Sequence, residues 1–363
     1  MKRLKVLTIV GARPQFVKAS AISRELRKQH TEILVHTGQH YDYGMSETFF
    51  NQLDIPKPDI NLKIASGSHA IQTGAMLIGL EQAILDHNPD WVLVYGDTNS
   101  TLAGSLTAAK LHIPICHVEA GLRSFNKQMP EEINRIVTDQ LSELLFCPSE
   151  ISVQNLAAEG ITSGVHNVGD VMADVLRNFM ESEQSNEKET LRRYNVTPEH
   201  YLIATVHRAE NTDDPVRLSG ILDSLLTLAE NEVVIFPVHP RTLKAIDSIE
   251  GKKRDCLSSD NFLLVDPVSY ADMILLTSRA RVLLTDSGGL QKEAYWLKTP
   301  CMTLRNETEW EETVESGWNH LVGADTNTIL EGIETLSIPN LYPVLYGDAH
   351  TATQCVRILT EAS

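Results

Sequence analysis

Residues 4–18 read LKVLTIVGARPQFVK, a short apolar run followed by a tight turn and the start of a helical pattern. The run at 4–10 is interrupted by Lys5 and leads straight into patterned sequence, so it predicts a first β-strand and not a signal peptide. The turn places Arg13 and Lys18 beside a helix N-terminus, where the helix dipole and two cations favour an anion. The alternative is that Arg13 and Lys18 merely solvate the start of the helix.

The same rhythm of short β-rich runs and longer helical patterns continues along the chain and restarts after residue 200. The further runs are EILVHT (32–37), WVLVY (91–95), PICHVE (114–119), LLFCP (144–148), YLIATVH (201–207), VVIFPVH (233–239), FLLVDPV (262–268), RVLLTDS (281–287) and PCMTL (300–304). Alternation of this kind predicts parallel sheets with crossover helices. A length of 363 residues also exceeds the size at which one core keeps growing. We therefore expect the α/β class, with two Rossmann-like, doubly wound domains and a cleft between them.

A polar stretch with few apolar residues, at 181–200, separates the two halves and follows Val168-Gly169-Asp170. This predicts an N-terminal domain at 1–170, a C-terminal domain at 171–345 and a hinge near 169–190. The final segment, 346–363, is helical by pattern. Its pattern is compatible with packing on either domain, including a return to the N-terminal one.

Composition narrows the function classes. The formal net charge of −17 argues against binding to nucleic acid, which depends on clustered Lys and Arg. No run approaches the roughly 18 apolar residues of a membrane span, so we expect a cytoplasmic protein without a membrane partner. The five cysteines show no CxxC spacing and are predicted to be reduced core residues: Cys116, Cys147, Cys256, Cys301 and Cys355.

Polar residues gather where the strands of the first half end, which is where parallel sheets bind ligands. Asp97 follows the strand at 91–95 and is either a functional carboxylate or a helix N-cap. His117 and Glu119 share one face by the two-residue period, and a charge in an apolar strand suggests use. Glu131 lies in the first turn of a helix opened by Pro130, where the helix dipole alone also explains it.

In the second half, His207 and His239 each follow a strand. Their spacing fits no metal site, so no metal is predicted, and His207 is a candidate acid or base or else a structural histidine. The strand at 281–285 leads into DSGGLQKEA (286–294), where two glycines open a helix. Bare amides of Ser287, Gly288 and Gly289 can hold phosphates, and Glu293 can accept hydrogen bonds from ribose hydroxyls. The alternative is a plain tight turn.

Eight motifs follow one another in order at the predicted strand ends. They are GARPQFVK (11–18), TGQH (37–40), GDTNST (96–101), HVEAGLRS (117–124), PEEINR (130–135), VHRAEN (206–211), PVHP (237–240) and DSGGLQKEA (286–294). This set resembles the non-hydrolysing UDP-N-acetylglucosamine 2-epimerase family over nearly the whole chain. The resemblance implies a GT-B-like arrangement that binds the nucleotide mainly through the C-terminal domain. It also implies a homodimer, elimination and re-addition of UDP through a 2-acetamidoglucal, and no cofactor.

The family's functional positions transfer residue by residue. The resemblance implies catalytic roles for Asp97, Glu119, Glu131 and His207. It implies contacts with the UDP-sugar for Arg13, Lys18, His239, Ser287, Gly288, Gly289, Glu293 and Arg305. The first turn lacks the GxGxxG arrangement of dinucleotide sites, so NAD is not expected there.

Departures from the family pattern bear on the substrate. Many relatives read GTRPE and a TERPE-like stretch, where this chain has GARPQ (11–15) and RNETEWE (305–311). The variant resembles enzymes acting on UDP-2,3-diacetamido-2,3-dideoxyglucuronic acid, which feed bacterial polysaccharide synthesis. In the family a second UDP-sugar can act as an activator beside TGQH, and residues 41–45 differ from that pattern. A GT-B glycosyltransferase, a hydrolysing epimerase and a non-catalytic UDP-sugar sensor are the competing interpretations.

Overall fold

The computed structural model describes residues 3–38, 56–64, 67–183, 186–249 and 260–363. The chain divides into two compact units, each with its own parallel sheet. Unit 1 contains residues Met1–Phe179 and Val344–Ser363, and unit 2 contains Met180–Pro343.

The sheet of unit 1 has seven parallel strands in the order β3-β2-β1-β4-β5-β6-β7. The strands are β1 Lys5–Val10, β2 Thr31–His36, β3 Ile60–Asn61, β4 Trp91–Tyr95, β5 Ile115–Val118, β6 Leu144–Cys147 and β7 Val165–Asn167. The central strands are nearly continuous apolar runs because helices cover both of their faces. Leu7 and Ile9 of β1 pack with Val92 and Val94 of β4 in one buried cluster.

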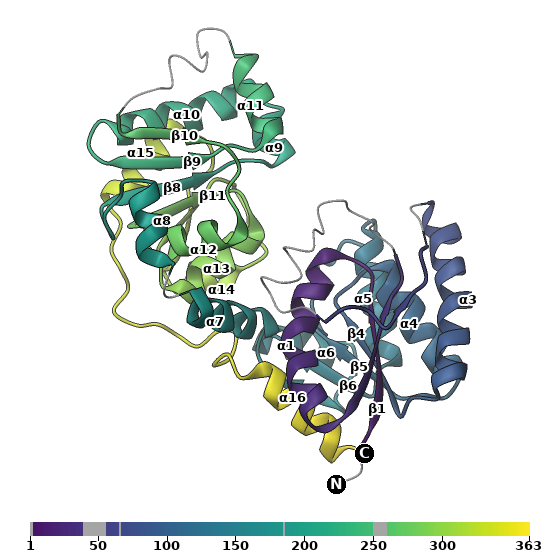
Figure 1. The fold of residues 1–363 in the computed structure, drawn as a ribbon. Coiled ribbons are helices and arrows are strands. Elements are labelled where there is room, and N and C mark those ends of the chain that lie inside the picture. Colours follow the sequence, from purple (N-terminus) through teal and green to yellow (C-terminus); the bar gives the residue numbers. More distant parts are fainter. Residues whose placement is uncertain (1–2, 39–55, 65–66, 184–185, 250–259) are drawn as a thin grey trace. The chain divides into compact units, whose positions relative to one another are not determined.

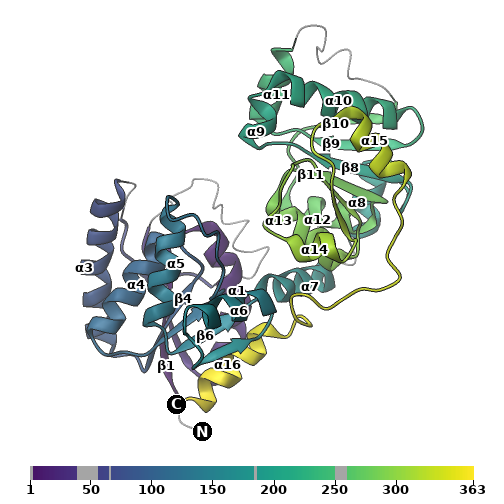
Figure 2. The same ribbon diagram turned by 180° about the vertical axis from the view of Figure 1, so that it is seen from behind.

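Helices cover the two faces of this sheet. They are α1 Arg13–Gln29, α3 His69–His87, α4 Asn99–Lys110, α5 Pro130–Leu141, α6 Glu150–Ala158, α7 Val171–Glu183, whose last residues belong to unit 2, and α16 Thr351–Glu361. Met76 and Leu80 of α3 join the cluster of Leu7 and Ile9. Helix α16, from the end of the chain, lies alongside α1 (Figures 1 and 2).

The sheet of unit 2 has six parallel strands in the order β10-β9-β8-β11-β12-β13. The strands are β8 Tyr201–Thr205, β9 Val233–Pro237, β10 Phe262–Val265, β11 Val282–Thr285, β12 Cys301–Thr303 and β13 Asn319–Leu321. The helices are α8 Glu187–Arg193, α9 Ala209–Thr212, α10 Pro215–Ala229, α11 Pro240–Asp247, α12 Tyr270–Arg279, α13 Gly288–Leu297, α14 Glu311–Glu315 and α15 Thr326–Glu334. Helices α10 and α15 supply the core on one face of the sheet, while α12 and α13 supply it on the other.

The fold class predicted from the sequence is confirmed. Both sheets are parallel and doubly wound, and each has the strand order 3-2-1-4-5-6 of nucleotide-binding folds, with β7 added at one edge of unit 1. All ten predicted strands are present. The sequence missed β3, β7 and β13, which have two or three residues each and carry too few side chains to show a period.

Other sequence predictions concern cysteines and membranes. Cys116, Cys147, Cys301 and Cys355 are free and buried, as predicted, and Cys256 lies outside the described residues. Within the described ranges, none of the helices combines the length and the apolar character of a membrane span.

Two glycines allow two stretches of unit 1 to meet near the point where the chain leaves it and returns. Asp170 donates its backbone N–H to the Tyr346 carbonyl at 2.8 Å, and Thr351 donates its hydroxyl to the Val168 carbonyl at 3.0 Å. Gly169 has φ of 87°. A Cβ atom there would lie 2.5 Å from the Tyr346 carbonyl oxygen and 2.7 Å from the Gly347 Cα.

The contact between these two stretches predicts how a substitution at Gly169 changes the free energy of unfolding. Gly169→Ala forces a left-handed backbone onto a residue with a Cβ and also pushes two backbone segments apart. Gly160→Ala is the matched control, because Gly160 has φ of 81° with no atom within 4 Å of its added Cβ. We expect the control to cost about 1 kcal/mol and Gly169→Ala about 1–3 kcal/mol more, measured by urea unfolding. Equal losses would show that the contact relaxes freely.

Candidate functional site

Ligands of doubly wound sheets bind at the carboxyl ends of the strands, where the strand order reverses. In unit 1 that point lies between β1 and β4, so the loops after Val10 and Tyr95 form it. In unit 2 it lies between β8 and β11, so the loops after Thr205 and Thr285 form it. Most of the sequence-predicted residues stand on these four loops or on the helices that follow them.

In unit 1, the buried side chain of Gln15 joins the two loops at the switch point. Its Oε1 accepts the backbone N–H groups of Gly11 and Ala12 at 2.8 and 3.1 Å. Its Nε2 donates to the Tyr95 carbonyl at 2.6 Å and to the hydroxyls of Thr98 and Thr101 at 3.0 and 2.9 Å. The amide therefore fixes the start of α1 against the start of α4.

In the sequence, Gln15 stands out only as a departure from GTRPE. Its role needs an acceptor and a donor in one side chain, and an amide supplies both, whereas an ionised glutamate at this position would only accept. The partners of its Nε2 lie 80 or more positions away along the chain, so no local pattern reveals them.

Asp97 is held as an ion pair and is not the N-cap of α4. Its Oδ2 accepts from Arg135 Nη2 at 2.6 Å and from Arg135 Nε at 2.9 Å. The N-cap of α4 is Thr98, whose hydroxyl accepts from the Thr101 N–H. The capping interpretation of Asp97 is therefore wrong. The carboxylate remains partly accessible, with 29% of its side chain exposed.

Glu119 combines an unusual backbone with a close ion pair. It follows β5 with φ of 73°, a left-handed conformation that is an outlier for a long side chain and costs roughly 1–2 kcal/mol. Its Oε2 accepts from Lys18 Nζ. Burial opposes the charge of Lys18, but Glu119, Asp170 and Asp97 outweigh it and raise the pKa of Lys18. Lys18 is thus paired with Glu119, and Asp170 and Asp97 are further negative charges in its surroundings.

His117 supports this cluster from within unit 1. Its Nδ1 lies 2.7 Å from Asp139 Oδ1 and its Nε2 lies 2.8 Å from the Gly96 carbonyl, so both nitrogens are bonded within the protein. Arg123 donates to the same aspartate at 2.7 Å. Burial opposes the charge of Asp139, but His117 and Arg123 outweigh it and lower the pKa of Asp139. The sequence did not single out Asp139 or Arg123.

The two glutamates that open α5 differ sharply. Glu131, the predicted catalytic residue, is exposed and makes no hydrogen bond or ion pair with any described residue. Glu132 is buried, accepts the backbone N–H groups of Ser124 and Phe125 at 2.9 Å, and accepts from Arg135 at 2.8 Å. Glu132 thus holds the cation that holds Asp97. The helix dipole alone therefore does not explain the position of Glu132.

In unit 2, Asp286 ties the loop after β8 to the start of α13. Its carboxylate accepts the backbone N–H groups of His207 at 3.0 Å and Arg208 at 2.9 Å, and the side chain of Asn211 at 3.1 Å. Its Oδ1 also lies 3.0 Å from His207 Nδ1. Burial opposes the charge, but these hydrogen bonds and His207 lower the pKa of Asp286.

The predicted phosphate seat is a helix start that is open at Gly289. Ser287 is the N-cap of α13, and its hydroxyl accepts from the Leu290 N–H at 3.4 Å. A Cβ atom on Gly289 would meet only the Ser287 hydroxyl, at 3.9 Å. This open approach is what an anion at helix amides requires.

The RNETEWE stretch lies against this helix start. Trp310 donates its indole N–H to the Gly288 carbonyl at 2.9 Å, and the Lys292 Nζ lies 4.0 Å from the Trp310 ring centroid. A Cβ on Gly288 would lie 3.4 Å from Glu309 and 3.7 Å from the guanidinium of Arg208. The departure from TERPE thus falls directly beside the predicted phosphate seat.

Arg305 and His239 complete the predicted set in unit 2. Arg305 is buried and donates to both oxygens of Glu309 at 3.0 and 3.1 Å. His239 is the N-cap of α11, and its Nδ1 accepts from the Arg241 N–H at 3.2 Å. The rings of His239 and His207 are neighbours, with centroids 6.4 Å apart.

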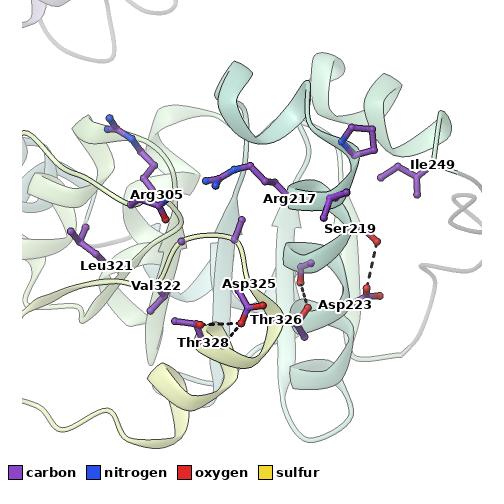
Figure 3. A pocket seen from close by; sticks show the side chains of 16 residues that line it. Arg217, Ser219, Asp223, Ile249, Arg305, Leu321, Val322, Asp325, Thr326 and Thr328 are labelled. Carbon is purple, nitrogen blue, oxygen red and sulfur yellow. Dashed lines mark hydrogen bonds between the residues drawn. The ribbon is translucent and has the colours of Figure 1, made fainter.

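A cavity of about 900 Å³ opens on unit 2 between the start of α10 and the loops that follow β12 and β13 (Figure 3). Arg217 points across it toward the Arg305 side (Figure 3). Some polar groups of the cavity pair with each other, as in the hydrogen bond of Thr328 to Asp325 at 3.0 Å. Of the predicted site residues, Arg305 alone lines it.

Glu293 is a buried carboxyl on α13. Tyr270 donates its hydroxyl to Glu293 Oε1 at 2.9 Å. Burial raises the pKa of Glu293 to about 7, although that hydrogen bond acts in the opposite direction.

Within the described ranges, no group of three or more His, Cys, Asp or Glu side chains could hold a metal ion.

Comparison with known proteins points to one family. A sequence model described as UDP-N-acetylglucosamine 2-epimerase matches residues 24–360. The chain is 50% identical over 357 residues to a UDP-N-acetylglucosamine 2-epimerase homolog of Methanococcus maripaludis, covering 98% of this chain and 99% of that one. It is also 50% identical over 338 residues, 92% of each chain, to the UDP-2,3-diacetamido-2,3-dideoxy-D-glucuronate 2-epimerase of Pseudomonas aeruginosa.

A solved structure of the same family also matches this chain. The UDP-GlcNAc 2-epimerase of Methanocaldococcus jannaschii, in complex with UDP-GlcNAc and UDP, matches with a TM-score of 0.80 and 40% identity. The match covers 99% of this chain and 100% of that one. It confirms the GT-B-like class that the sequence predicted.

The buried carboxyl of Glu293 generates a prediction about pH and stability. Its pKa is about 7 in the folded protein and has an ordinary value of 4.5. Between these values the folded state holds one proton more than the unfolded state, so the free energy of unfolding falls as pH rises from 4.5 through 7. The loss is up to about 3 kcal/mol. Glu293→Gln removes this pH-dependent contribution to the free energy of unfolding, because glutamine does not ionise.

Urea unfolding at pH 5 and pH 8 measures the effect. The difference in stability between Glu293→Gln and wild type should shift in favour of the variant at pH 8. The exposed Glu230→Gln serves as the control and should show no such shift. Parallel pH profiles for wild type and Glu293→Gln would mean that Glu293 is already ionised at pH 5.

Proposed function

Because this chain belongs to the UDP-N-acetylglucosamine 2-epimerase family, we propose that it interconverts UDP-GlcNAc and UDP-ManNAc without net hydrolysis. The observation that carries the proposal is the cluster of Lys18, Asp97 and Glu119 at the switch point of unit 1. The M. jannaschii enzyme was solved with UDP-GlcNAc and UDP, which supports a UDP-sugar as the ligand.

The chemistry explains why such a cluster is useful. C2 of the sugar has no neighbouring carbonyl to acidify its hydrogen, so the reaction depends on the departure of UDP. A base removes the C2 proton, the C1–O bond breaks with its electron pair leaving on UDP, and a C1=C2 bond forms. Return of a proton to the opposite face of C2 and of UDP to C1 completes the inversion.

Unit 1 supplies the groups for the proton transfers in this proposal. Inversion needs a donor or acceptor on each face of C2, and the two carboxylates of Asp97 and Glu119 can provide them. Asp97 and Glu119 are both held in place by cations and both partly accessible. Glu131 is the exposed third carboxylate of the set, and Arg13 stands exposed in the first turn of α1.

Unit 2 supplies the nucleotide contacts in this proposal. The amides of Ser287, Gly288 and Gly289 are suited to the diphosphate, and Arg305 and His239 add polar contacts. Glu293 would accept hydrogen bonds from the ribose hydroxyls. Since burial raises its pKa to about 7, this contact should strengthen as the pH rises above 7.

A second candidate substrate is the 2,3-diacetamido glucuronate counterpart. It is favoured by the 50% identical P. aeruginosa protein that carries that name, and by the RNETEWE stretch beside Gly288. Its additional carboxylate would need a cation, and Arg208 and Lys292 lie close to that helix start, beside the carboxylate of Glu309. With either substrate, we propose that the product is used in the synthesis of bacterial surface polysaccharides.

Proton NMR in deuterated water tests the function with both compounds. Wild type should introduce deuterium at C2 and form the manno product. Glu119→Gln should lower the rate by about 10²-fold or more, because it removes a proton-transfer group. Glu25→Gln is the control, since Glu25 makes an exposed ion pair with Lys28 on the same helix as Lys18.

Other outcomes identify the competing functions. Accumulation of free UDP and free ManNAc would indicate a hydrolysing enzyme. Absence of C2 exchange with both compounds would contradict the epimerase proposal and favour a transferase or a sensor. Activation by a second UDP-sugar can be tested in the same assay, although the segment at 41–45 that departs from the family pattern lies outside the described residues.

We also propose a homodimer formed through α3. Ile71, Ile78 and Leu85 are 72%, 74% and 60% exposed and are spaced seven residues apart, so they form one apolar stripe along the helix. A stripe of this kind on a helix is self-complementary across a two-fold axis. The cytoplasmic location stays a prediction from the sequence.

Analytical ultracentrifugation tests the dimer. Ile78→Glu should convert it to monomer at micromolar concentration, since a charge would be buried in the interface. Ile338→Glu, a control at an exposed position of unit 2, should leave the mass unchanged. A wild-type monomer, or an Ile78→Glu protein that stays dimeric, would overturn the assignment of this face.

A further inference from the structure

We propose that Asp286 is a positioning residue for the proposed reaction, which fixes His207 in the tautomer with its proton on Nδ1 and thereby presents Nε2 as the reactive nitrogen. The contact of Asp286 Oδ1 with His207 Nδ1 at 3.0 Å carries the inference. The kinetic part rests on the proposed function, and the tautomer itself does not.

The surroundings of Asp286 allow it only one role in this contact. Its side chain is fully buried and faces the N–H groups of His207, Arg208 and Asn211. A carboxylate that accepts from three N–H groups is ionised and has no proton to donate. Because Asp286 can only accept in this contact, we assign the proton of the neutral His207 ring to Nδ1.

The consequence appears at the other nitrogen. The His207 side chain is 43% exposed while its partner is buried, so the ring projects from the loop with one edge anchored. In the neutral ring Nε2 is a proton acceptor, and in the charged ring it is a proton donor. The ring of His239 is a titratable neighbour, with its centroid 6.4 Å away.

The same carboxylate also places His207 next to the phosphate seat. Asp286 directly precedes Ser287, the N-cap of α13, so one residue sets both the imidazole and the start of the anion-binding helix. An imidazole in this position can exchange a proton with a leaving or returning phosphate oxygen or with the sugar. Its usefulness depends on its orientation, as in other carboxylate-oriented histidines.

Nitrogen NMR of wild-type protein tests the tautomer directly. With ¹⁵N-histidine labelling and His207→Gln for assignment, spectra at pH 8 should show a protonated Nδ1 and an unprotonated Nε2. Free neutral histidine prefers the opposite tautomer, so the result is diagnostic. A proton found on Nε2 would overturn the proposal, and this test needs no folded variant of Asp286.

Kinetics test the positioning role. Asp286→Asn places an amide where a carboxylate stood and should reverse the tautomer, lowering kcat by about 10²-fold or more with little change in KM. Asp247→Asn, at the exposed end of α11, is the control and should match wild type.

The outcomes separate this inference from the proposed function. A protonated Nδ1 without turnover of any UDP-sugar would leave the tautomer assigned and contradict the epimerase proposal. An active wild type together with a folded Asp286→Asn of unchanged kcat would contradict the positioning role alone. A reduced kcat combined with the reversed tautomer supports both.

Discussion

Each switch point depends on one buried side chain that satisfies the backbone groups of two loops at once. A polar loop can end in the interior of a parallel sheet only if its N–H and C=O groups find partners there. In unit 1 the partner is the amide of Gln15, which accepts from one loop and donates to the other. In unit 2 it is the carboxylate of Asp286, which accepts successive N–H groups of the loop after β8. The residues predicted to do chemistry stand on these two fixed platforms.

The charges of unit 1 form a chain in which each carboxylate has a cation as its neighbour. Glu132 binds Arg135, Arg135 binds Asp97, and Lys18 binds Glu119 while also interacting with Asp97. A protein with a formal net charge of −17 thus places cations directly beside these carboxylates. The strained backbone at Glu119 persists because its side chain is held from the other end.

The sequence predicted the sheets and the identities of most site residues because both are local properties. Apolar runs at 4–10 and 201–205 show a strand without any knowledge of its neighbours. What it could not predict depends on contacts between distant segments. Neither Thr98 as the cap in place of Asp97, nor the buried Glu132 beside the exposed Glu131, nor the anchoring of His207 by Asp286 leaves a mark in spacing. His117, predicted with Glu119 from one strand period, turned out to be a buried support.

The return of α16 to unit 1 has a consequence for how the chain is made. His30 lies 2.8 Å from the Thr360 hydroxyl, Trp91 donates to the Ser363 hydroxyl at 2.8 Å, and Cys355, Val356 and Leu359 are buried. On a ribosome, unit 1 can therefore complete its fold only after residues 344–363 have emerged, while unit 2 can fold as soon as residues 180–343 are out. Until then, the face of α1 that α16 covers in the folded protein stays exposed in unit 1. Nascent chains released early are those for which chaperone protection of this face matters most.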